Sequence, residues 1–455
     1  MKKLQPALVL CCAAVMAFTA CAANAPSDQS QSQFTGGASS QPAAEKVTLT
    51  VSHDYTKEEA EAGDITRKGP RDAILKYAED NKDTVTLDIT EIQHNDYETK
   101  MQALAAANDL PDVFQVKGSW INNFVENGLL ADLTDAYNSC AFKDEYRDYL
   151  FDPATVDGKI YCAPMQFSST ALVFYNLDLW KQAGYDTLPA TWQEMLAANG
   201  TFESMGLDEF SFGNKDKWQI NSSWISAIAD RYTGTDWTNS IIAKDGKSKF
   251  TDPAFVSALS LIRDIGASGA LNPDYSAITH QQAAAQFIQG KSATFIDGYW
   301  GISYLTSNAD ADFLSKVVIA PHPGVEGGLG DAGAITAGCG WFLGVNSQLE
   351  GAAKEAAEGL VFAASGPVLS QAMSDAGYIS TCNTTPSDLS ALTQLNLDYM
   401  NLVDNASSTI HIYDARIDAA VIDVMNENLA QLLAGSTTPE DAAQAIQAEY
   451  ETLLN

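Results

Sequence analysis

Hydrophobic and polar positions near the start of the chain follow two alternating patterns. Short stretches with apolar or β-branched residues at every second position are typical of strands, and longer stretches with apolar residues three or four apart are typical of helices. The first pattern predicts strands over residues 47–51, 84–89 and 112–116, and the second predicts helices over 71–81 and 97–108. Strand, helix and strand in succession predict an α/β fold with a mostly parallel sheet and covering helices.

Helical patterns continue through the rest of the chain, over residues 177–183, 191–198, 253–268, 281–289, 351–365 and 439–454. Two of these helices have clear start signals. Asp252-Pro253 and Thr438-Pro439 each offer a capping side chain followed by proline at the first helical position. No internal repeat is visible, so we expect two α/β lobes.

Composition and charge narrow the class of protein. The 455 residues are 46% hydrophobic and 18% charged, which is typical of a globular chain with two or three domains. The formal net charge of -32 repels phosphate backbones and anionic lipid surfaces, which argues against nucleic acid as a partner. Neutral or cationic ligands are easier to accommodate.

The first residues have the pattern of an export signal. Lys2 and Lys3 precede an apolar run from Leu8 to Phe18, and small residues follow, which predicts a signal peptide over residues 1–20. Phe18-Thr19-Ala20-Cys21 resembles the bacterial lipobox, and this resemblance implies that Cys21 receives a lipid and anchors the protein to the outer face of the cell membrane. The alternative is an ordinary signal peptide in which Cys21 stands by chance.

Residues 22–45 are rich in Ala, Ser, Gln, Pro and Gly and have almost no large apolar side chain, so we expect a flexible tether after the anchor at Cys21. Four cysteines remain beyond the tether, at positions 140, 162, 339 and 382. Two disulfides and four free thiols both remain open, because none of the four stands in a CxxC pair.

Four blocks of sequence have motifs in a characteristic order. The most specific is Gly158-Lys159-Ile160-Tyr161-Cys162-Ala163-Pro164, followed in order by Phe174-Tyr175-Asn176 and by Pro189-Ala190-Thr191-Trp192. The other blocks are residues 97–134, residues 287–300, and residues 338–347 with the helix after them. Together these blocks resemble the extracellular solute-binding proteins of ABC transporters, family 1, the maltose-binding type. Cys162, Leu177 and Thr294 depart from the family pattern at positions that we interpret as structural.

The resemblance implies a periplasmic-binding-protein-like fold, in which a hinge joins two lobes and the ligand lies in the cleft between them. By position, the N-terminal lobe comprises residues 46–153 and 325–366, and the C-terminal lobe comprises 154–324 and 367–455. It further implies a monomer without cofactor that binds a sugar, closes around it, and delivers it to an ABC transporter permease.

A sugar site needs aromatic platforms for the apolar ring faces and planar polar groups for the hydroxyls. Trp300 is the first candidate, because it closes the block 287–300 and follows Gly298. The other candidates are the aromatic residues Tyr55, Trp120, Tyr175, Trp224 and Trp341 and the polar residues Asp54, Asp297 and Arg416. A place in the core is the alternative for each aromatic residue, and a solvated face is the interpretation that we favour for Arg416. We assign Trp180 and Trp192 to packing.

Sugar binding has two alternatives. An enzyme has little support, because no nucleophile elbow, zinc helix or phosphate loop is present and the five histidines are scattered. A glycosidase needs only two suitably placed carboxylates, however, so the absence of a motif does not exclude one. A polyamine or another cationic solute is the alternative cargo, since carboxylates and aromatic rings both attract cations.

Overall fold

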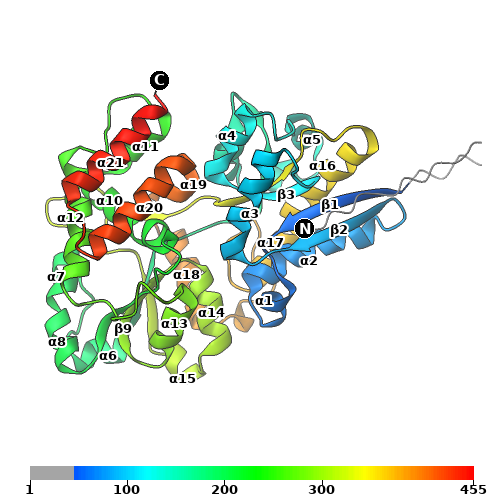
Figure 1. Cartoon of the computed structure of the whole chain (residues 1–455). Coiled ribbons are helices and arrows are strands. Elements are labelled where there is room, and N and C mark those ends of the chain that lie inside the picture. The colour runs from blue at the N-terminus through cyan, green and yellow to red at the C-terminus, as the bar shows by residue number, and fades with distance from the viewer. Residues whose placement is uncertain (1–45, 455) are drawn as a thin grey trace, which may run out of the picture. The chain divides into compact units, whose positions relative to one another are not determined.

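The structure is a computed structural model and describes residues 46–454. The signal peptide over residues 1–20, the lipidated Cys21 and the tether over 22–45 are predictions that lie outside the described residues. In Figure 1, elements far apart in the chain lie side by side, such as the yellow α16 beside the blue and cyan N-terminal elements.

The first sheet has the strand order β2-β1-β3-β12-β6. Its strands are β1 (Val47–His53), β2 (Val85–Glu91), β3 (Val113–Lys117), β12 (Trp341–Val345) and β6 (Cys162–Pro164). β1 pairs in parallel with β2 and β3, whereas β12 pairs antiparallel with β3 and β6. We call this sheet and the helices that pack on it lobe 1.

Lobe 1 is covered by helices from two separate parts of the chain. They are α1 (Lys57–Glu61), α2 (Ile65–Asp80), α3 (His94–Ala107), α4 (Ile121–Glu126), α5 (Thr134–Ser139), α16 (Gly351–Ser365) and α17 (Pro367–Asp375). The hydroxyl of Tyr77 on α2 donates to the Ala356 carbonyl of α16 over 2.8 Å. Short elements fill the connections: η1 (Gly118–Trp120), η2 (Lys143–Glu145), η3 (Asp148–Ala154), β4 (Thr155–Val156) and β5 (Lys159–Ile160).

The second sheet has the strand order β10-β7-β9-β8 and forms lobe 2 with its helices. Its strands are β7 (Leu172–Asn176), β8 (Asp208–Ser211), β9 (Ser292–Asp297) and β10 (Val317–Ala320). Its helices are α6 (Leu177–Gln182), α7 (Trp192–Ala197), α8 (Asn199–Ser204), α9 (Trp218–Ile220), the π-helix η4 (Asn221–Ile225), α10 (Ser226–Thr233), α11 (Thr235–Ala243), α12 (Pro253–Ala267), α13 (His280–Ile288), α14 (Trp300–Asn308), α15 (Ala311–Leu314), η5 (Leu389–Ala391), α18 (Gln394–Asp404), α19 (Tyr413–Arg416), α20 (Ala419–Leu433) and α21 (Pro439–Thr452).

Segments 165–171 and 335–340 each cross between the lobes, and segment 409–412, between α18 and α19 of lobe 2, is hydrogen-bonded to the second of them. β11 (Ile335–Thr336) pairs in parallel with β13 (Thr409–Ile410), and Ser168 forms an antiparallel bridge with Gly338. We call segments 165–171, 335–340 and 409–412 the hinge layer.

The two-lobed α/β fold is confirmed, but the sheets are mixed and not mostly parallel. β12 begins at Trp341 opposite Lys117, where β3 ends, and β7 begins at Leu172 opposite Asp297, where β9 ends. Both strands enter their sheets directly from the hinge layer. A strand that enters at the edge where its neighbour ends must run antiparallel to that neighbour.

The predicted lobe boundaries stay a prediction, and two short elements bear on them. β6 lies within the range predicted for the C-terminal lobe but pairs with β12 of the first sheet. Met373 Sδ of α17 lies 3.0 Å from the position that a Cβ on Gly69 of α2 would take. These contacts argue for placing β6 and α17 with lobe 1.

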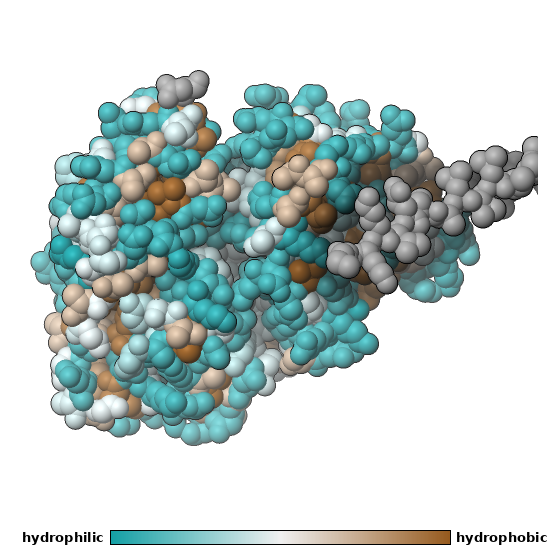
Figure 2. Space-filling view, in the orientation of Figure 1, coloured by the Kyte–Doolittle hydropathy of each residue, from teal (hydrophilic) through white to brown (hydrophobic). Residues whose placement is uncertain are grey.

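On the face seen in Figure 2, hydrophilic residues predominate and hydrophobic ones form small separate groups. The four cysteines within residues 46–454 are free thiols, and all but the half-buried Cys140 are buried. No helix in this range is long and apolar enough to cross a membrane.

Candidate ligand-binding site

A cavity opens between the two lobes, at the edges where β3 and β9 end. It holds about 920 Å³ of space between atoms, its open mouth included. Lobe 1, lobe 2 and the hinge region all contribute to its lining, principally through Glu59, Asp64, Arg67, His94, Glu98, Lys117, Gln166, Ser168, Thr170, Trp218, His280, Tyr299, Trp300, Trp341, Ile412 and Asp414. This position is the one expected for ligands of open α/β sheets, beyond the carboxyl ends of strands.

Three half-buried tryptophans form the aromatic part of the cavity wall. Trp341 comes from lobe 1, and Trp218 and Trp300 come from lobe 2. The rings of Trp218 and Trp300 meet edge to face, with centroids 5.7 Å apart at 66°. His94 lies between the lobes, with its ring centroid 5.5 Å from Trp341 and 6.1 Å from Trp218. The wall therefore offers exposed ring faces from both lobes.

Asp297 lies behind this wall and contacts Trp300 and His280, which line the cavity. Its Oδ1 accepts from Trp300 Nε1 over 2.6 Å, from Gln219 Nε2 over 2.7 Å and from its neighbour's backbone N–H over 2.9 Å. Its Oδ2 lies 3.2 Å from His280 Nδ1. Only 1% of Asp297 is exposed, so its carboxylate orients side chains that face the cavity and does not itself face it.

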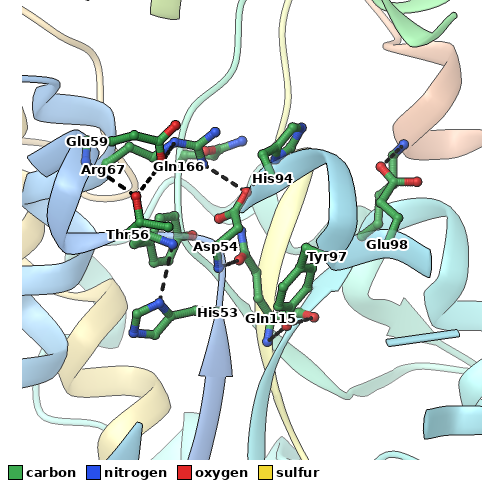
Figure 3. A network of polar contacts seen from close by, with 12 residues as sticks. His53, Asp54, Thr56, Glu59, Arg67, His94, Tyr97, Glu98, Gln115 and Gln166 are labelled. Atoms are coloured by element: carbon green, nitrogen blue, oxygen red, sulfur yellow. Dashed lines mark hydrogen bonds and ion pairs between the residues drawn. The ribbon is translucent and has the colours of Figure 1, made fainter. Parts of the chain in front are cut away.

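Asp54 has the corresponding place in lobe 1, directly after β1. Figure 3 shows Arg67 and His94 pointing toward its carboxylate, which Arg67 Nη1 contacts over 2.9 Å and His94 Nδ1 contacts as well. The side-chain oxygen of Gln115 accepts from the backbone N–H of Asp54 over 2.9 Å. Asp54 is fully buried, whereas Arg67 and His94 line the cavity.

The charge of Arg67 and the contact with His94 keep Asp54 ionised. Burial alone raises the pKa of Asp54, but the Arg67 guanidinium and the His94 ring outweigh burial, and the pKa lies well below its ordinary value. The neighbouring ring of His53 is different. Burial lowers the pKa of His53 to about 4 although the Asp54 carboxylate acts in the opposite direction, so His53 is neutral at physiological pH.

Lys117 lies at the end of β3 among carboxylates of both lobes. Its Nζ is 2.8 Å from Glu98 and 3.6 Å from Asp414, and it lies 5.9 Å from the centre of the Trp341 ring. Burial lowers the pKa of Lys117, but the carboxylates of Glu98 and Asp414 raise it by more, so the pKa lies above its ordinary value. The lysine therefore stays charged, and it places a positive charge beside Trp341 in the cavity wall.

A second cavity continues the first one beyond His94 and Trp218. It holds about 1520 Å³ with its mouth included, and it shares His94, Glu98, Lys117 and Trp218 with the first cavity. Its further walls come from α3, α4 and α20. Together the two cavities form one long groove, with Trp218 in the wall of both.

The structure brings only part of the predicted site to the cavity. Trp300 and Trp341 line it, and Asp54 and Asp297 lie directly behind it. Trp120 is buried behind Trp341, with centroids 5.6 Å apart, and lines the second cavity. The remaining candidates do not line the first cavity: Tyr55, Tyr175 and Trp224 are fully buried, and Arg416 faces cavities on the other side of the hinge layer.

Several lining residues escaped the sequence reasoning, among them Arg67, His94, Gln166, Trp218 and His280. One signal was available for His94, because it begins the helix directly after β2, at the carboxyl end of that strand. Trp218 and His280 follow no strand directly. They reach the cavity through tertiary packing that spacing along the chain does not express.

We expect Asp297→Ala to weaken ligand binding although Asp297 does not line the cavity. Loss of the carboxylate frees the Trp300 ring and leaves Gln219 without its partner, so affinity falls by about 1.5 kcal/mol, or roughly tenfold. Asp297→Asn keeps an oxygen for the Trp300 N–H and is expected to retain most of the affinity. Titration calorimetry well below the melting temperature measures both variants, and equal affinities for wild type and Asp297→Ala would contradict this role.

Metal ligation has no support in the part of the chain that the structure describes. Within residues 46–454, no group of three or more His, Cys, Asp or Glu side chains is arranged to hold a metal ion. His94 and His280 are each engaged with a single aspartate through Nδ1. Each of these two histidines is thus held by a carboxylate of the protein.

Comparison with known structures places the fold. A structure from work on xylan utilization by the thermophilic bacterium Caldanaerobius polysaccharolyticus superposes with a TM-score of 0.77 at 27% identity, over 88% of this chain and 99% of that one. A chitin oligosaccharide binding protein gives a TM-score of 0.80 at 21% identity, over 90% of this chain and all of the other. At that identity the second likeness shows the fold alone.

Comparison with known sequences gives the family. A binding protein of Brucella abortus is 25% identical over 288 residues, which are 61% of this chain and 64% of that protein. The diacetylchitobiose binding protein of Streptomyces coelicolor is 24% identical over 239 residues, which are 52% of this chain and half of that protein. The match thus spans less than two thirds of either relative. Because the model of the bacterial extracellular solute-binding proteins matches residues 72–394, the chain belongs to that family.

Proposed function

We propose that this protein is the extracytoplasmic substrate-binding component of an ABC importer and that it binds a carbohydrate in the groove between the lobes. The observation that carries the proposal is the set of three half-buried tryptophans that line the cavity together with carboxylates, amides and hydroxyls. Ring faces suit the apolar C–H faces of a sugar, and the planar polar groups suit its hydroxyls. The similar structure from work on xylan utilization and the relative named as a diacetylchitobiose binding protein support this cargo.

The length of the groove favours an oligosaccharide over a monosaccharide. The first cavity by itself is of the size of a small-molecule site, and the second continues it past Trp218. We propose that the lobes close around the ligand and that the closed form is the one that the membrane permease recognises. A ligand can favour closure only by its higher affinity for the closed form.

A thermal-shift screen of the protein without its signal and anchor tests this function. We expect a rise in melting temperature with one series of oligosaccharides, because a ligand that binds only the native state stabilises it by mass action. Mono- and oligosaccharides are screened beside polyamines and amino acids. A response to no sugar, together with a response to another class, would refute carbohydrate binding.

The second cavity also favours one alternative cargo, a polyamine or another cationic solute. Four carboxylates line it, from Glu98, Asp216, Asp418 and Asp423, and Lys117 is the one lysine or arginine among its described lining residues. Carboxylates and aromatic rings together hold cations well. Displacement of a bound sugar by spermidine separates competition at one site from independent binding.

We propose binding without turnover. The carboxylates of Asp54 and Asp297 hold neighbouring side chains, which leaves neither as a free acid or base. Oligosaccharides recovered intact after long incubation with the protein are the expected result, and shortened products would identify a glycosidase.

We further propose a monomer that is held at the membrane by a lipid on Cys21. Two alkyl chains are enough for stable anchoring. Cys21→Ser is expected to release the exported protein from the membrane fraction into the soluble one, which immunoblotting of the two fractions measures. A variant that remains in the membrane fraction would exclude Cys21 as the anchor.

A further inference from the structure

Two cavities lie behind the hinge layer, on the side away from the proposed ligand site. They hold about 740 and 650 Å³ with their mouths included, and both are lined by Asp152, Pro153, Ala415 and Arg416. Ile412 and Ala415 also line the first cavity of the proposed ligand site, which we call the front cavity. The chain that separates the front from the back is therefore a single layer, and both sides of it are hollow.

The back cavities bring opposite charges from the two lobes near each other. Asp152 belongs to η3, whose Leu150 and Phe151 are buried in the core of lobe 1 near Tyr137. Arg416 belongs to α19, which is held in lobe 2 because Ser226 Oγ accepts from the Tyr413 N–H over 3.1 Å. Burial lowers the pKa of Arg416, and the Asp152 carboxylate acts in the opposite direction, which places the two groups within electrostatic reach.

In this structure the pair behind the hinge is not closed. Among residues 46–454, the Arg416 guanidinium forms no ion pair within 4 Å, and the two cavities surround it. On the side of the proposed ligand site, in contrast, contacts bridge the two lobes. Asn95 Nδ2 of lobe 1 donates to Asp216 of lobe 2 over 3.1 Å, and the His94 ring contacts Trp218. A bridged front thus accompanies an open back.

The backbones of the two lobes are in close contact beside these cavities. The Ala415 carbonyl oxygen lies 2.5 Å from the position that a Cβ on Gly118 would take, so the two backbones meet at Gly118 with no room for a side chain. Gly118 follows β3 of lobe 1, and Ala415 lies on α19 between Asp414 and Arg416. Asp414 faces the front cavity and Arg416 faces the back, so the contact lies between the two sides.

Rotation of one lobe about this contact moves the two sides in opposite directions. Widening of the front groove narrows the back cavities, and closure of the front widens them. We infer that Asp152 and Arg416 form an ion pair behind the hinge when the groove opens, and that this pair stabilises the open, ligand-free form. The inference rests on the proposed function only for its effect on ligand affinity. On this inference Arg416 acts on the balance between the open and closed forms and does not contact the ligand.

Asp152→Asn, Arg416→Gln and the double variant test the pair, with Asp148→Asn as the matched control. Asp148 lies on the same helix and is exposed, and it lines neither back cavity. An ion pair of ordinary strength changes an equilibrium about two- to fivefold. Asp152→Asn and Arg416→Gln are each expected to raise the closed-to-open ratio of the ligand-free protein by this factor, and the double variant is expected to raise it no further.

The closed-to-open ratio is measured on the exported protein by electron spin resonance distances between nitroxide labels. Lys100→Cys on α3 and Glu427→Cys on α20 place exposed labels on opposite lobes, with Cys140→Ser to remove the half-buried thiol. This measurement needs no sugar, so it remains decisive if the proposed ligand class is wrong. If Asp152→Asn gives the same distance distribution as Asp148→Asn, the inference fails.

Affinity for the ligand found by screening gives the second measurement. A larger closed fraction lowers the apparent dissociation constant in proportion. Asp152→Asn and Arg416→Gln are therefore both expected to bind about two to five times more tightly than wild type. Weaker binding by Arg416→Gln with no change in Asp152→Asn would overturn the inference and return Arg416 to the ligand site.

Discussion

Trp300→Ala is expected to weaken ligand binding by about 2–3 kcal/mol, which is roughly 30- to 150-fold in Kd, while the protein stays folded. The ring is half-buried and lines the cavity, so its loss removes a stacking surface and not a part of the core. Its orientation is fixed by the bond from Nε1 to Asp297. Titration calorimetry gives the affinity, and the melting temperature reports the fold.

Gly298 also sets the position of the Trp300 ring. The Trp300 ring lies over its Cα, with ring atoms 2.3–2.5 Å from the position that a Cβ would take, so any side chain at this position must displace the ring. Trp300→Phe keeps a ring but loses the bond to Asp297, and we expect it to bind with an affinity between those of wild type and Trp300→Ala.

Trp224→Ala is the matched control for this prediction. Trp224 is fully buried in the core of lobe 2, with its ring centroid 4.9 Å from Phe212. Truncation of such a side chain costs about 3–5 kcal/mol of stability. Weaker binding without instability in Trp300→Ala, and instability in Trp224→Ala, would assign the two tryptophans to site and core. A large loss of stability in Trp300→Ala would instead make Trp300 a core residue.

The elements of the fold could be predicted from the sequence because hydrophobic spacing records which face of each element is buried. The helix predicted over 253–268 is Pro253–Ala267, and the one over 351–365 is Gly351–Ser365. The direction of β12 and β7 could not be predicted in this way. Strand direction depends on where the chain enters the sheet from the hinge layer, and side-chain alternation reads the same in both directions.

The site could be predicted only in part. Residues at the ends of strands, such as Asp54 and Asp297, were found because topology places those ends at the cleft. Their role differs from the expected one, since each aspartate is buried and holds residues that face the ligand. Tyr175 shows the other limit. It stands in the most specific family block, yet it is buried in lobe 2, 5.5 Å from the centre of Trp180.

A buried carboxyl in lobe 2 is expected to make the stability of the protein depend on pH. Glu209 on β8 is fully buried, and neither of its carboxyl oxygens has a hydrogen-bond partner within residues 46–454. Burial raises the pKa of Glu209 from 4.5 to about 9. The carboxyl is therefore protonated in the folded protein at pH 7 and ionised in the unfolded chain.

The sign of the pH effect follows from this difference. Between pH 4.5 and about 9 the folded state keeps a proton that the unfolded state releases, so the free energy of unfolding falls as pH rises through this range. The slope is about 1.4 kcal/mol for each pH unit, and the loss at pH 7 is roughly 3 kcal/mol. Above about pH 9 the folded state releases its proton too, and the effect levels off.

Buried histidines act on the acid side of this range. Burial lowers the pKa of His322 to about 3 and that of His53 to about 4, so unfolding takes up protons below pH 6.5. Their contribution to stability is lost as pH falls from 6.5, whereas that of Glu209 is lost as pH rises. A comparison of variants between pH 7 and 9 therefore isolates Glu209 from the histidines.

Glu209→Gln is expected to remove this pH dependence. The amide is neutral at every pH and has nearly the same shape, so the variant is as stable as wild type near pH 5 and more stable by roughly 3 kcal/mol at pH 7. Urea unfolding at several pH values measures both proteins. Glu203→Gln is the control, because Glu203 is exposed on α8 and the same change there is expected to alter nothing. Parallel pH profiles for wild type and Glu209→Gln would show that Glu209 is ionised in the folded state, which would require water or a cation at its carboxylate.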